Sequence, residues 1–306
     1  MTYQLRPENG LIDSARTILT EQLVSAAHSL ENPANGRDAA VHLARRKLKR
    51  ARGLYRLIAA AAPDFRKQEN IRLRDIARSL AGLRDASALV ESVTYLQAWT
   101  EEEEEQKALT TALSLLKAQS EQTLETNQSC DDCILTAAAN CREAAEALAQ
   151  ADITVRTAKS GRILQKAWRK LMIQAQEAIA ICQTGSEAES FHDLRKTSQT
   201  YWMYLSLLRD LWPSAFLLKR QCAKQLADQL GHENDLSMLA AALDQQAASF
   251  DSAETLSHLL GMIIRRQQVL RADALAAAEA LFRDGPELEP AIVMGLWLRY
   301  ADLAQN

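Results

Sequence analysis

An internal repeat restricts this chain to a duplicated fold. Residues 42–89 align without gaps with residues 192–239, at a constant offset of 150 positions. The matches run through the whole span: His42 with His192, Arg45 with Arg195, Leu57 with Leu207, Pro63 with Pro213, Leu80 with Leu230 and Asp85 with Asp235. Such a duplication predicts two similar halves packed about a pseudo-twofold axis. We place the halves at about residues 11–183 and 189–304, within a single domain spanning residues 1–306.

The composition predicts that both halves are helical. The chain is 47% hydrophobic and contains only 10 Gly and 6 Pro among 306 residues. Few helix breakers, and no long alternation of apolar and polar residues, predict an all-α fold. The first ten residues are expected to be disordered or loosely attached. Helices are predicted at residues 11–30, 41–59, 65–80, 86–100, 110–127, 132–150, 153–182, 191–211, 215–230, 235–250 and 253–283, with a last helix after Pro290.

The predicted helix at residues 41–59 carries seven Lys and Arg residues and no acid. At 3.6 residues per turn, one face is apolar and another is a cationic stripe roughly 80° wide. The stripe consists of His42, Arg45, Lys49, Arg52 and Arg56, with Arg46 at its edge. Solvent-facing helices usually intersperse acids with their cations, so the pattern favours an anionic ligand. An ordinary solvated amphipathic helix is the alternative.

The positive charge of the chain is local. The net charge is -3, with 39 Asp and Glu against 36 Lys and Arg. A basic patch on an acidic body directs its field at one polyanion site and disfavours diffuse binding to nucleic acid. The predicted helix at 153–182 carries a second stripe, formed by Lys159, Arg162, Lys166 and Arg169. If the fold brings the two stripes together they form a groove; a plain solvent face is the alternative.

These paired motifs resemble the CHAD family, the conserved-histidine α-helical domain, over about residues 37–299. The family's His-x-x-Arg opening and basic run correspond to residues 42–52, and again to FHDLRK at residues 191–196. A Leu-Gly-x-x-x-Asp type segment corresponds to LAGLRD, ending at Asp85, and LGHEND, ending at Asp235, with Gly82 displaced by one position. A Gly-Arg pair typical of the family stands at Gly161 and Arg162. The resemblance implies two four-helix bundles, and non-catalytic binding of inorganic polyphosphate in a basic groove between them.

The second half departs from the family pattern because it lacks most of the basic run. Gln199, Thr200, Trp202 and Ser206 stand where the first half has Lys49, Arg50, Arg52 and Arg56. We therefore predict an asymmetric site weighted to the first half. The predicted polyphosphate-binding residues are His42, Arg45, Arg46, Lys49, Arg50, Arg52 and Arg56, with His192, Arg195 and Lys196, and secondarily Lys159, Arg162, Lys166 and Arg169.

Three alternatives receive less support from the sequence. A metal site could join His42 and His192, or use Cys130-x-x-Cys133 with Cys141, but either ligand set is incomplete. A phosphate-transferring enzyme needs carboxylates for magnesium or a Gly-rich loop, and neither accompanies the basic stripes. Binding to nucleic acid or nucleoid normally interleaves aromatic residues with cations. We expect no catalytic residues, no metal and no cofactor.

The remaining features predict a cytoplasmic protein, with polyphosphate granules as a candidate location. The five cysteines are odd in number and suit reduced thiols. The N-terminus lacks the pattern of a signal peptide, and no apolar stretch reaches the length of a membrane span. The acidic run 101–105 lacks the alternation of a CYTH-domain strand, so we expect a solvated helix start and no CYTH domain. The sequence does not identify a protein partner.

Overall fold

The computed structural model describes residues 3–81, 85–100, 102–125, 129–185, 188–247 and 252–304. Within these residues the chain forms one short 3-10 helix and eleven α-helices, and no strand, which confirms the predicted all-α fold. The elements are η1 (Pro7–Asn9), α1 (Leu11–Glu31), α2 (Arg37–Leu57), α3 (Pro63–Ser79), α4 (Asp85–Gln97), α5 (Glu103–Glu125), α6 (Ser129–Gln150), α7 (Thr157–Thr184), α8 (Ala188–Leu207), α9 (Pro213–Gln245), α10 (Ala253–Leu281) and α11 (Gly285–Leu303).

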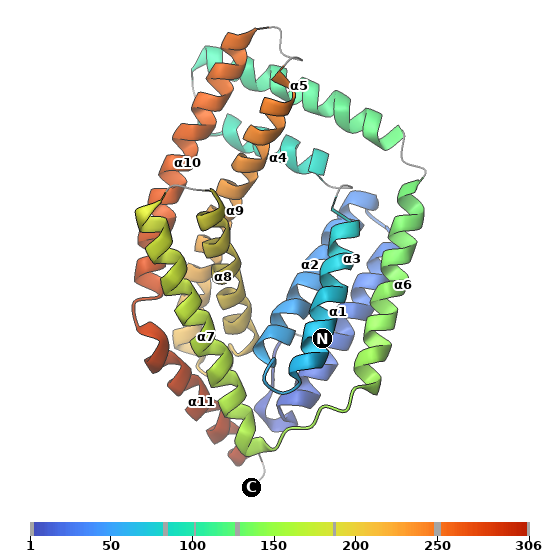
Figure 1. Cartoon of the computed structure of the whole chain (residues 1–306), viewed down its shortest axis with the longest axis vertical. Coiled ribbons are helices and arrows are strands. Elements are labelled where there is room, and N and C mark those ends of the chain that lie inside the picture. The colour runs from blue at the N-terminus through green and yellow to red at the C-terminus, as the bar shows by residue number, and fades with distance from the viewer. Residues whose placement is uncertain are drawn as a thin grey trace.

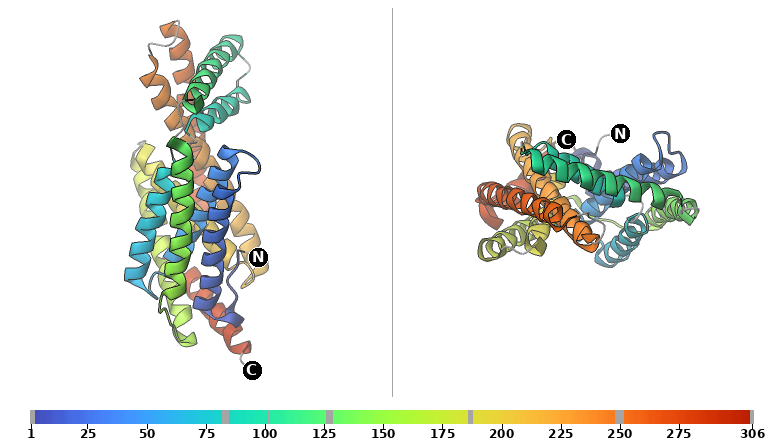
Figure 2. Two further views of the ribbon diagram at one scale, coloured as in Figure 1. Left: turned by 90° about the vertical axis from the view of Figure 1, so that its right-hand side faces the viewer. Right: turned by 90° about the horizontal axis from the view of Figure 1, so that it is seen from above.

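The helices pack in three groups (Figure 1). Helices α1, α2, α3 and α6 form one group, and α7, α8, α9 and α11 form a second beside it. Helices α4 and α5 pack against α9 and α10 and form a third group at one end of the molecule (Figure 2). The third group has its own buried cluster, which includes Val93, Leu109, Leu239 and Ile263. The predicted description as two four-helix bundles therefore does not include the third group. A twofold relation between complete bundles remains a prediction.

The helix ends repeat at the predicted offset. Helices α2 and α8 end at Leu57 and Leu207, and α3 and α9 begin at Pro63 and Pro213. A proline suits the first helical turn, because the N–H that it lacks would have no partner within the helix. The residues before the prolines, Ala62 and Trp212, share φ −148°, with ψ 80° and 75°. This helix–turn–helix segment thus has the same local structure in both halves.

Helices α2 and α8 meet at equivalent positions of the repeat. A Cβ atom on Gly53 would lie 2.9 Å from Met203 Sδ, and Met203 occupies the repeat position of Gly53. Contact between equivalent residues is what a local twofold axis between two helices requires. The absent side chain at Gly53 allows the two helices to approach closely.

Helix α9 differs from the prediction, because it continues through residues 231–234, where we expected a break. Gly231 lies inside this helix of 33 residues. A helical glycine costs about 1 kcal/mol relative to alanine. Burial of Leu226 and Leu230 on one side of it, and of Leu236 and Leu239 on the other, outweighs that cost. The predicted break at Pro290 is also wrong, since Pro290 lies within α11.

The N-terminal segment is ordered, contrary to expectation. Leu5 is only 2% exposed, and its N–H donates to Leu207 O at 2.8 Å. The Tyr3 hydroxyl donates to Arg50 O at 3.0 Å. Residues 3–5 therefore contact both α2 and α8 beside the place where these helices meet.

The acidic run is only partly solvated. Glu105 of α5 is 8% exposed and forms an ion pair with Arg265 of α10, so it connects two helices of the third group. Gly82, Glu101 and the side chains of Asp85 and Cys130 lie outside the described residues. Among the described helices, none has both the length and the apolar character needed to cross a membrane.

Candidate functional site

Three arginines of α2 turn toward the neighbouring helices α3 and α8. Each is half-buried, and each donates a hydrogen bond to an uncharged acceptor. The bonds are Arg45 Nη1 to Ala77 O at 3.1 Å, Arg52 Nε to Asn70 Oδ1 at 3.1 Å and Arg56 Nη1 to Thr200 Oγ1 at 2.6 Å. These acceptors hold the three side chains in place, and those of Arg52 and Arg56 do not neutralise the guanidinium charge.

Helix α3 carries a second row of cations beside the first. Arg66, Arg74 and Arg78 share a four-residue spacing with Asn70, and residues four apart lie on one face of a helix. The bonds from Arg52 to Asn70 and from Arg45 to Ala77 show that α3 runs antiparallel to α2. The cations of the two helices therefore form adjacent rows.

We use the term arginine cluster for Arg52, Arg56, Arg66, Arg74 and Arg78. Burial lowers the pKa of the Arg52 guanidinium, and the other four members of the cluster lower it further. Every charged group that contributes to this shift is an arginine. Arg74 also contacts Asp75 at the surface, at 3.0 Å. The cluster thus concentrates like charge in a partly desolvated place.

The arginine cluster also reaches helix α8. Burial raises the pKa of the Tyr204 hydroxyl of α8, and the charges of Arg56 and Arg66 act against that rise. Arg66 Nε is buried and has no hydrogen-bond partner among the described residues. A desolvated cationic donor without an acceptor is unfavourable, and an anion bound there would remove that cost.

The other side of α2 carries a separate set of cations. The Arg50 guanidinium lies over the Tyr3 ring, 5.2 Å from its centroid. Burial lowers the pKa of Arg50, and Arg46 adds to the effect. The structure therefore separates Arg46 and Arg50 from the arginine cluster, although one basic run contains them all. His42 and Lys49, which belong to the stripe of Arg52 and Arg56 and not to this side, are exposed on α2.

Helix α7 touches α2, but among the described residues no hydrogen bond or ion pair joins the cationic stripe of α7 to α2. Lys159, Arg162, Lys166 and Arg169 are all exposed. Arg169 pairs with Glu287 of α11, with 2.6 Å between Nη2 and Oε1. The Gly161 face also packs on α11, since a Cβ atom there would lie 2.8 Å from Leu298 Cγ. A groove shared by the α2 and α7 stripes remains a prediction.

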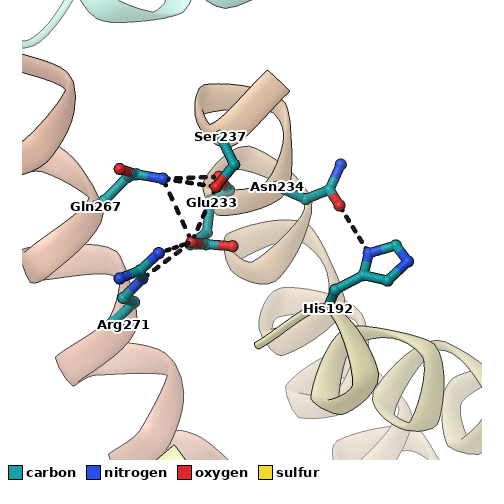
Figure 3. A network of polar contacts seen from close by, with 6 residues as sticks. All are labelled: His192, Glu233, Asn234, Ser237, Gln267 and Arg271. Carbon is teal, nitrogen blue, oxygen red and sulfur yellow. Dashed lines mark hydrogen bonds and ion pairs between the residues drawn. The ribbon is translucent and has the colours of Figure 1, made fainter. Parts of the chain in front are cut away.

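The second-half residues have polar partners of their own (Figure 3). His192 Nδ1 lies 2.7 Å from Asn234 Oδ1 of α9. Lys196 pairs with Asp193 at 2.8 Å and with Glu189 at 3.8 Å. Arg195 Nε is buried without a hydrogen-bond partner among the described residues. Of the three predicted cationic positions, only Lys196 is therefore charge-compensated within its own helix.

A buried ion pair lies on the other side of α9. The carboxylate of Glu233 is 1% exposed and accepts hydrogen bonds from Arg271 of α10, at 2.9 Å from Nε and 2.7 Å from Nη2. Gln267 Nε2 and the Ser237 hydroxyl complete the network around Glu233 (Figure 3). This network connects α9 to α10 and compensates the charge of Arg271.

Sequence reasoning did not assign Arg66, Arg74 and Arg78 to the site. Their four-residue spacing, which places them on one face of a helix, is the sequence feature from which they could have been identified. A helical angle shows which residues share a face, but not which neighbouring helix that face meets. The contacts of Arg45 and Arg52 with α3 supply that information.

Two further features bear on the choice of ligand. Among the described residues, no group of three or more His, Cys, Asp and Glu side chains is arranged to hold a metal ion. A pocket of about 420 Å³ lies between α3 and α6, and its charged lining is Arg72, Asp75, Asp132 and Glu143. Three carboxylates against one guanidinium make this pocket unsuited to a polyanion, so the arginine cluster is the better candidate.

Comparison with known proteins gives the family. The CHAD domain model matches residues 17–244. The fold is similar to the crystal structure of the CHAD domain from the plant Ricinus communis, with a TM-score of 0.59 and 18% sequence identity, over 92% of this chain and 93% of that chain. No curated protein sequence matches the chain. Because the family model covers well over half of the sequence, the chain belongs to the CHAD domain family.

Proposed function

We propose that this chain binds inorganic polyphosphate at the arginine cluster and catalyses no reaction on it. The observation that carries the proposal is the set of charges around Arg52, all of which are arginines from α2 and α3. Crowded like charges raise the free energy of the unliganded protein. A polyanion compensates them, whereas a neutral or cationic ligand does not.

Polyphosphate chemistry suits this arrangement. The ligand is a flexible chain of phosphates with no base to stack and no groove to read. Arginine presents planar forked donors that match phosphate oxygens. Side chains held by bonds such as Arg52 to Asn70 and Arg56 to Thr200 lose less conformational freedom on binding than mobile ones. Two rigid antiparallel helices thus provide a preorganised double row of cations.

The remaining predicted residues take different places in this proposal. His42, Arg45 and Lys49 extend the α2 row, while Arg46 and Arg50 belong to the opposite side of α2. His192, Arg195 and Lys196 form a secondary contact on α8. Lys159, Arg162 and Lys166 on α7 would contact only a ligand long enough to leave the arginine cluster. Arg169 contributes least, because Glu287 already neutralises it.

The proposal describes binding rather than turnover. Phosphoryl transfer needs carboxylates that place magnesium ions against the phosphates, and the charges around Arg52 are cationic. A protein that only holds polyphosphate is suited to targeting or organising polyphosphate granules in the cytoplasm. Binding to nucleic acid, the main alternative, uses the same electrostatic attraction and is separated by the experiment below.

A salt-dependent titration tests the proposal. Long-chain polyphosphate, duplex DNA and ATP are titrated into the protein at several salt concentrations. We expect the tightest binding for polyphosphate, with an affinity that falls linearly on logarithmic axes as salt rises. Arg45→Ala and Lys49→Ala should weaken binding. Lys107→Ala should not, because Lys107 is paired with Glu103 at 2.7 Å on α5. Equal weak binding to all three ligands would indicate a generic basic surface and contradict the proposal.

A further inference from the structure

The contacts of Asn234 determine which nitrogen of His192 carries a proton. Asn234 Nδ2 lies 3.4 Å from Asp235 Oδ1, and Asn234 Oδ1 lies 2.7 Å from His192 Nδ1. An amide nitrogen only donates and a carboxylate oxygen only accepts, so the contact with Asp235 orients the amide. The oxygen that faces the imidazole must then accept its hydrogen bond from Nδ1–H (Figure 3).

This tautomer has a consequence for anion binding. A neutral imidazole has one nitrogen that donates and one that accepts. With the proton on Nδ1, the free Nε2 carries a lone pair, which repels a phosphate oxygen. Only the imidazolium, protonated on both nitrogens, can keep the bond to Asn234 and also donate to phosphate.

We propose that Asn234 is a positioning residue that fixes neutral His192 in the Nδ1–H tautomer, so that His192 binds phosphate only after taking up a proton on Nε2. The inference rests on the proposed function, because it concerns the same polyphosphate ligand. It makes the α8 contact proton-coupled, whereas the arginine cluster keeps its charge at every physiological pH.

The charges around His192 and Asn234 explain why protonation of His192 affects anion binding at this place. Most charges on the neighbouring helices are already compensated: Asp193 pairs with Lys196, and Glu233 pairs with Arg271. Among the residues that the structure describes, the charged and titratable groups near His192 come from five helices. They are Glu189, Asp193, Arg195 and Lys196 on α8, His232, Glu233 and Asp235 on α9, Arg271 on α10, Cys182 on α7 and, two turns away, Arg56 of α2 at Thr200.

Two of these titratable groups do not supply a proton-dependent charge on the face of α8 that carries His192. The His232 ring stacks on Tyr95 of α4, with 4.1 Å between centroids, and thus faces the third group. Burial raises the pKa of the Cys182 thiol to about 11, so this thiol stays neutral near physiological pH. Protonation of His192 is therefore the simplest way for this face of α8 to gain positive charge.

The first half provides an internal comparison. Its equivalent histidine is His42, and Arg84 stands at the repeat position of Asn234. An arginine side chain has no acceptor atom and cannot accept a hydrogen bond from an imidazole. The repeat position of Asn234 therefore offers no such acceptor in the first half of the sequence.

The tautomer can be measured without any ligand. Nitrogen NMR of the imidazole rings at about pH 8.5, where histidine is mostly neutral, should show His192 protonated at Nδ1 and unprotonated at Nε2. His192→Gln assigns the signal. Asn234→Ala should move a large share of the protons to Nε2. Protonation at Nε2 in the wild-type protein would overturn the inference, whether or not the protein binds polyphosphate.

The coupling to binding is measured by titrating polyphosphate at about pH 6 and about pH 8.5. We expect the wild-type affinity to fall about tenfold more across this range than that of His192→Gln, because one charge-assisted hydrogen bond is lost. His28→Gln, on α1 beside Asn32 and outside the proposed binding residues, should retain the wild-type pH dependence. If wild type and His192→Gln show equal pH dependence, this inference fails and the proposed function survives. If the wild type does not bind polyphosphate, both fail.

Discussion

Two helix pairs, α2–α3 and α8–α9, are joined by turns at matching repeat positions, but they differ in electrostatics at equivalent residues. Arg52 and Arg74 are like charges close enough for Arg74 to lower the pKa of Arg52. Their counterparts are Trp202 and Lys224, where the lysine lies over the indole ring at 6.0 Å. A repulsive pair in the first half is thus an attractive cation–π pair in the second.

A second position shows the same contrast. Glu69 of α3 is fully buried, and its carboxylate oxygens accept no hydrogen bond from the described residues. Its counterpart Lys219 donates to Asp284 and to the buried Glu289. Prolines and buried leucines determine the shared helix positions, so charge can be arranged freely on this framework. The first half leaves both kinds of charge poorly satisfied, and of these only the crowded arginines can be compensated by an anion. The second half satisfies its charges internally.

The largest expected effect is a loss of stability caused by a substitution in the second half. Glu289 accepts hydrogen bonds from Trp168 Nε1 at 3.1 Å, Tyr201 Oη at 2.7 Å and Lys219 Nζ at 2.8 Å. Glu289→Ala leaves the buried donors of Trp168 and Tyr201 without an acceptor and removes one of the two partners of Lys219. It should lower the free energy of unfolding by about 3–5 kcal/mol. Urea denaturation measures the loss. Glu287→Ala, which removes the exposed partner of Arg169, should cost less than about 1 kcal/mol; similar losses would contradict the role of the buried network.

The next effect concerns binding in the first half. Arg52→Ala removes the central guanidinium of the arginine cluster and should weaken polyphosphate binding about tenfold, the value of one charged hydrogen bond. The slope of log affinity against log salt should fall by about 0.7–0.9. Isothermal titration calorimetry at several salt concentrations measures both.

The control for Arg52→Ala is Lys224→Ala. It also removes one positive charge, but from the second half, where Asp228 already pairs with that lysine. We expect an affinity change below about twofold. Equal losses in the two variants would mean that only total charge matters and that the halves do not differ as binding surfaces.

A smaller effect concerns Glu69. Burial raises the pKa of its carboxyl, and Arg72, 3.6 Å away, only partly opposes this. A raised pKa means that the folded state favours the protonated form, so the charged form destabilises the protein above the ordinary value of 4.5. Glu69→Gln should therefore stabilise the protein by about 1 kcal/mol near pH 7.

Denaturation at several pH values tests this sign. The gain from Glu69→Gln should shrink as the pH falls toward 4.5, where the wild-type carboxyl becomes protonated in both states. Glu103→Gln, at an exposed site paired with Lys107, should change stability by less than about 0.5 kcal/mol. A Glu69→Gln protein that is less stable than wild type near pH 7 would show that the carboxylate is better satisfied than its contacts indicate.

The smallest effect compares the two sides of α2. Arg50→Ala removes a cation that lies over Tyr3, away from the arginine cluster. Its polyphosphate affinity should fall by less than about threefold, which corresponds to about 0.6 kcal/mol. The same titrations give the value. A loss as large as that of Arg52→Ala would place Arg50 in the binding site and restore the broader site expected from the sequence.

Local signals predicted much of the fold. The prolines at positions 63 and 213 predicted where the preceding helices stop, and α2 and α8 do end shortly before them. The acid-free stripe on α2 included Arg45, Arg52 and Arg56, the three arginines that turn toward α3 and α8. Tertiary contacts explain the failures. Packing into two cores keeps Gly231 within a continuous helix, and a backbone bond from Leu5 to Leu207 orders a segment that composition alone describes as loose.

The candidate site was less predictable for the same reason. The basic run of α2 contains seven cations in twelve positions, and sequence spacing cannot show that Arg50 packs on Tyr3 while Arg52 faces α3. The α3 row follows a regular spacing of its own, but its function depends on lying antiparallel beside α2. Only contacts between residues distant in sequence distinguish a binding surface from an ordinary solvated one.

The continuous helix α9 has a consequence for how the protein unfolds. Phe216 and Leu226 of α9 belong to the large core of the first two groups, whereas Leu239 and Leu243 belong to the core of the third. Helices form and melt cooperatively, so melting either end of α9 removes packing from both cores. We therefore predict that the third group does not unfold as an independent domain and that the chain loses its structure in one concerted transition.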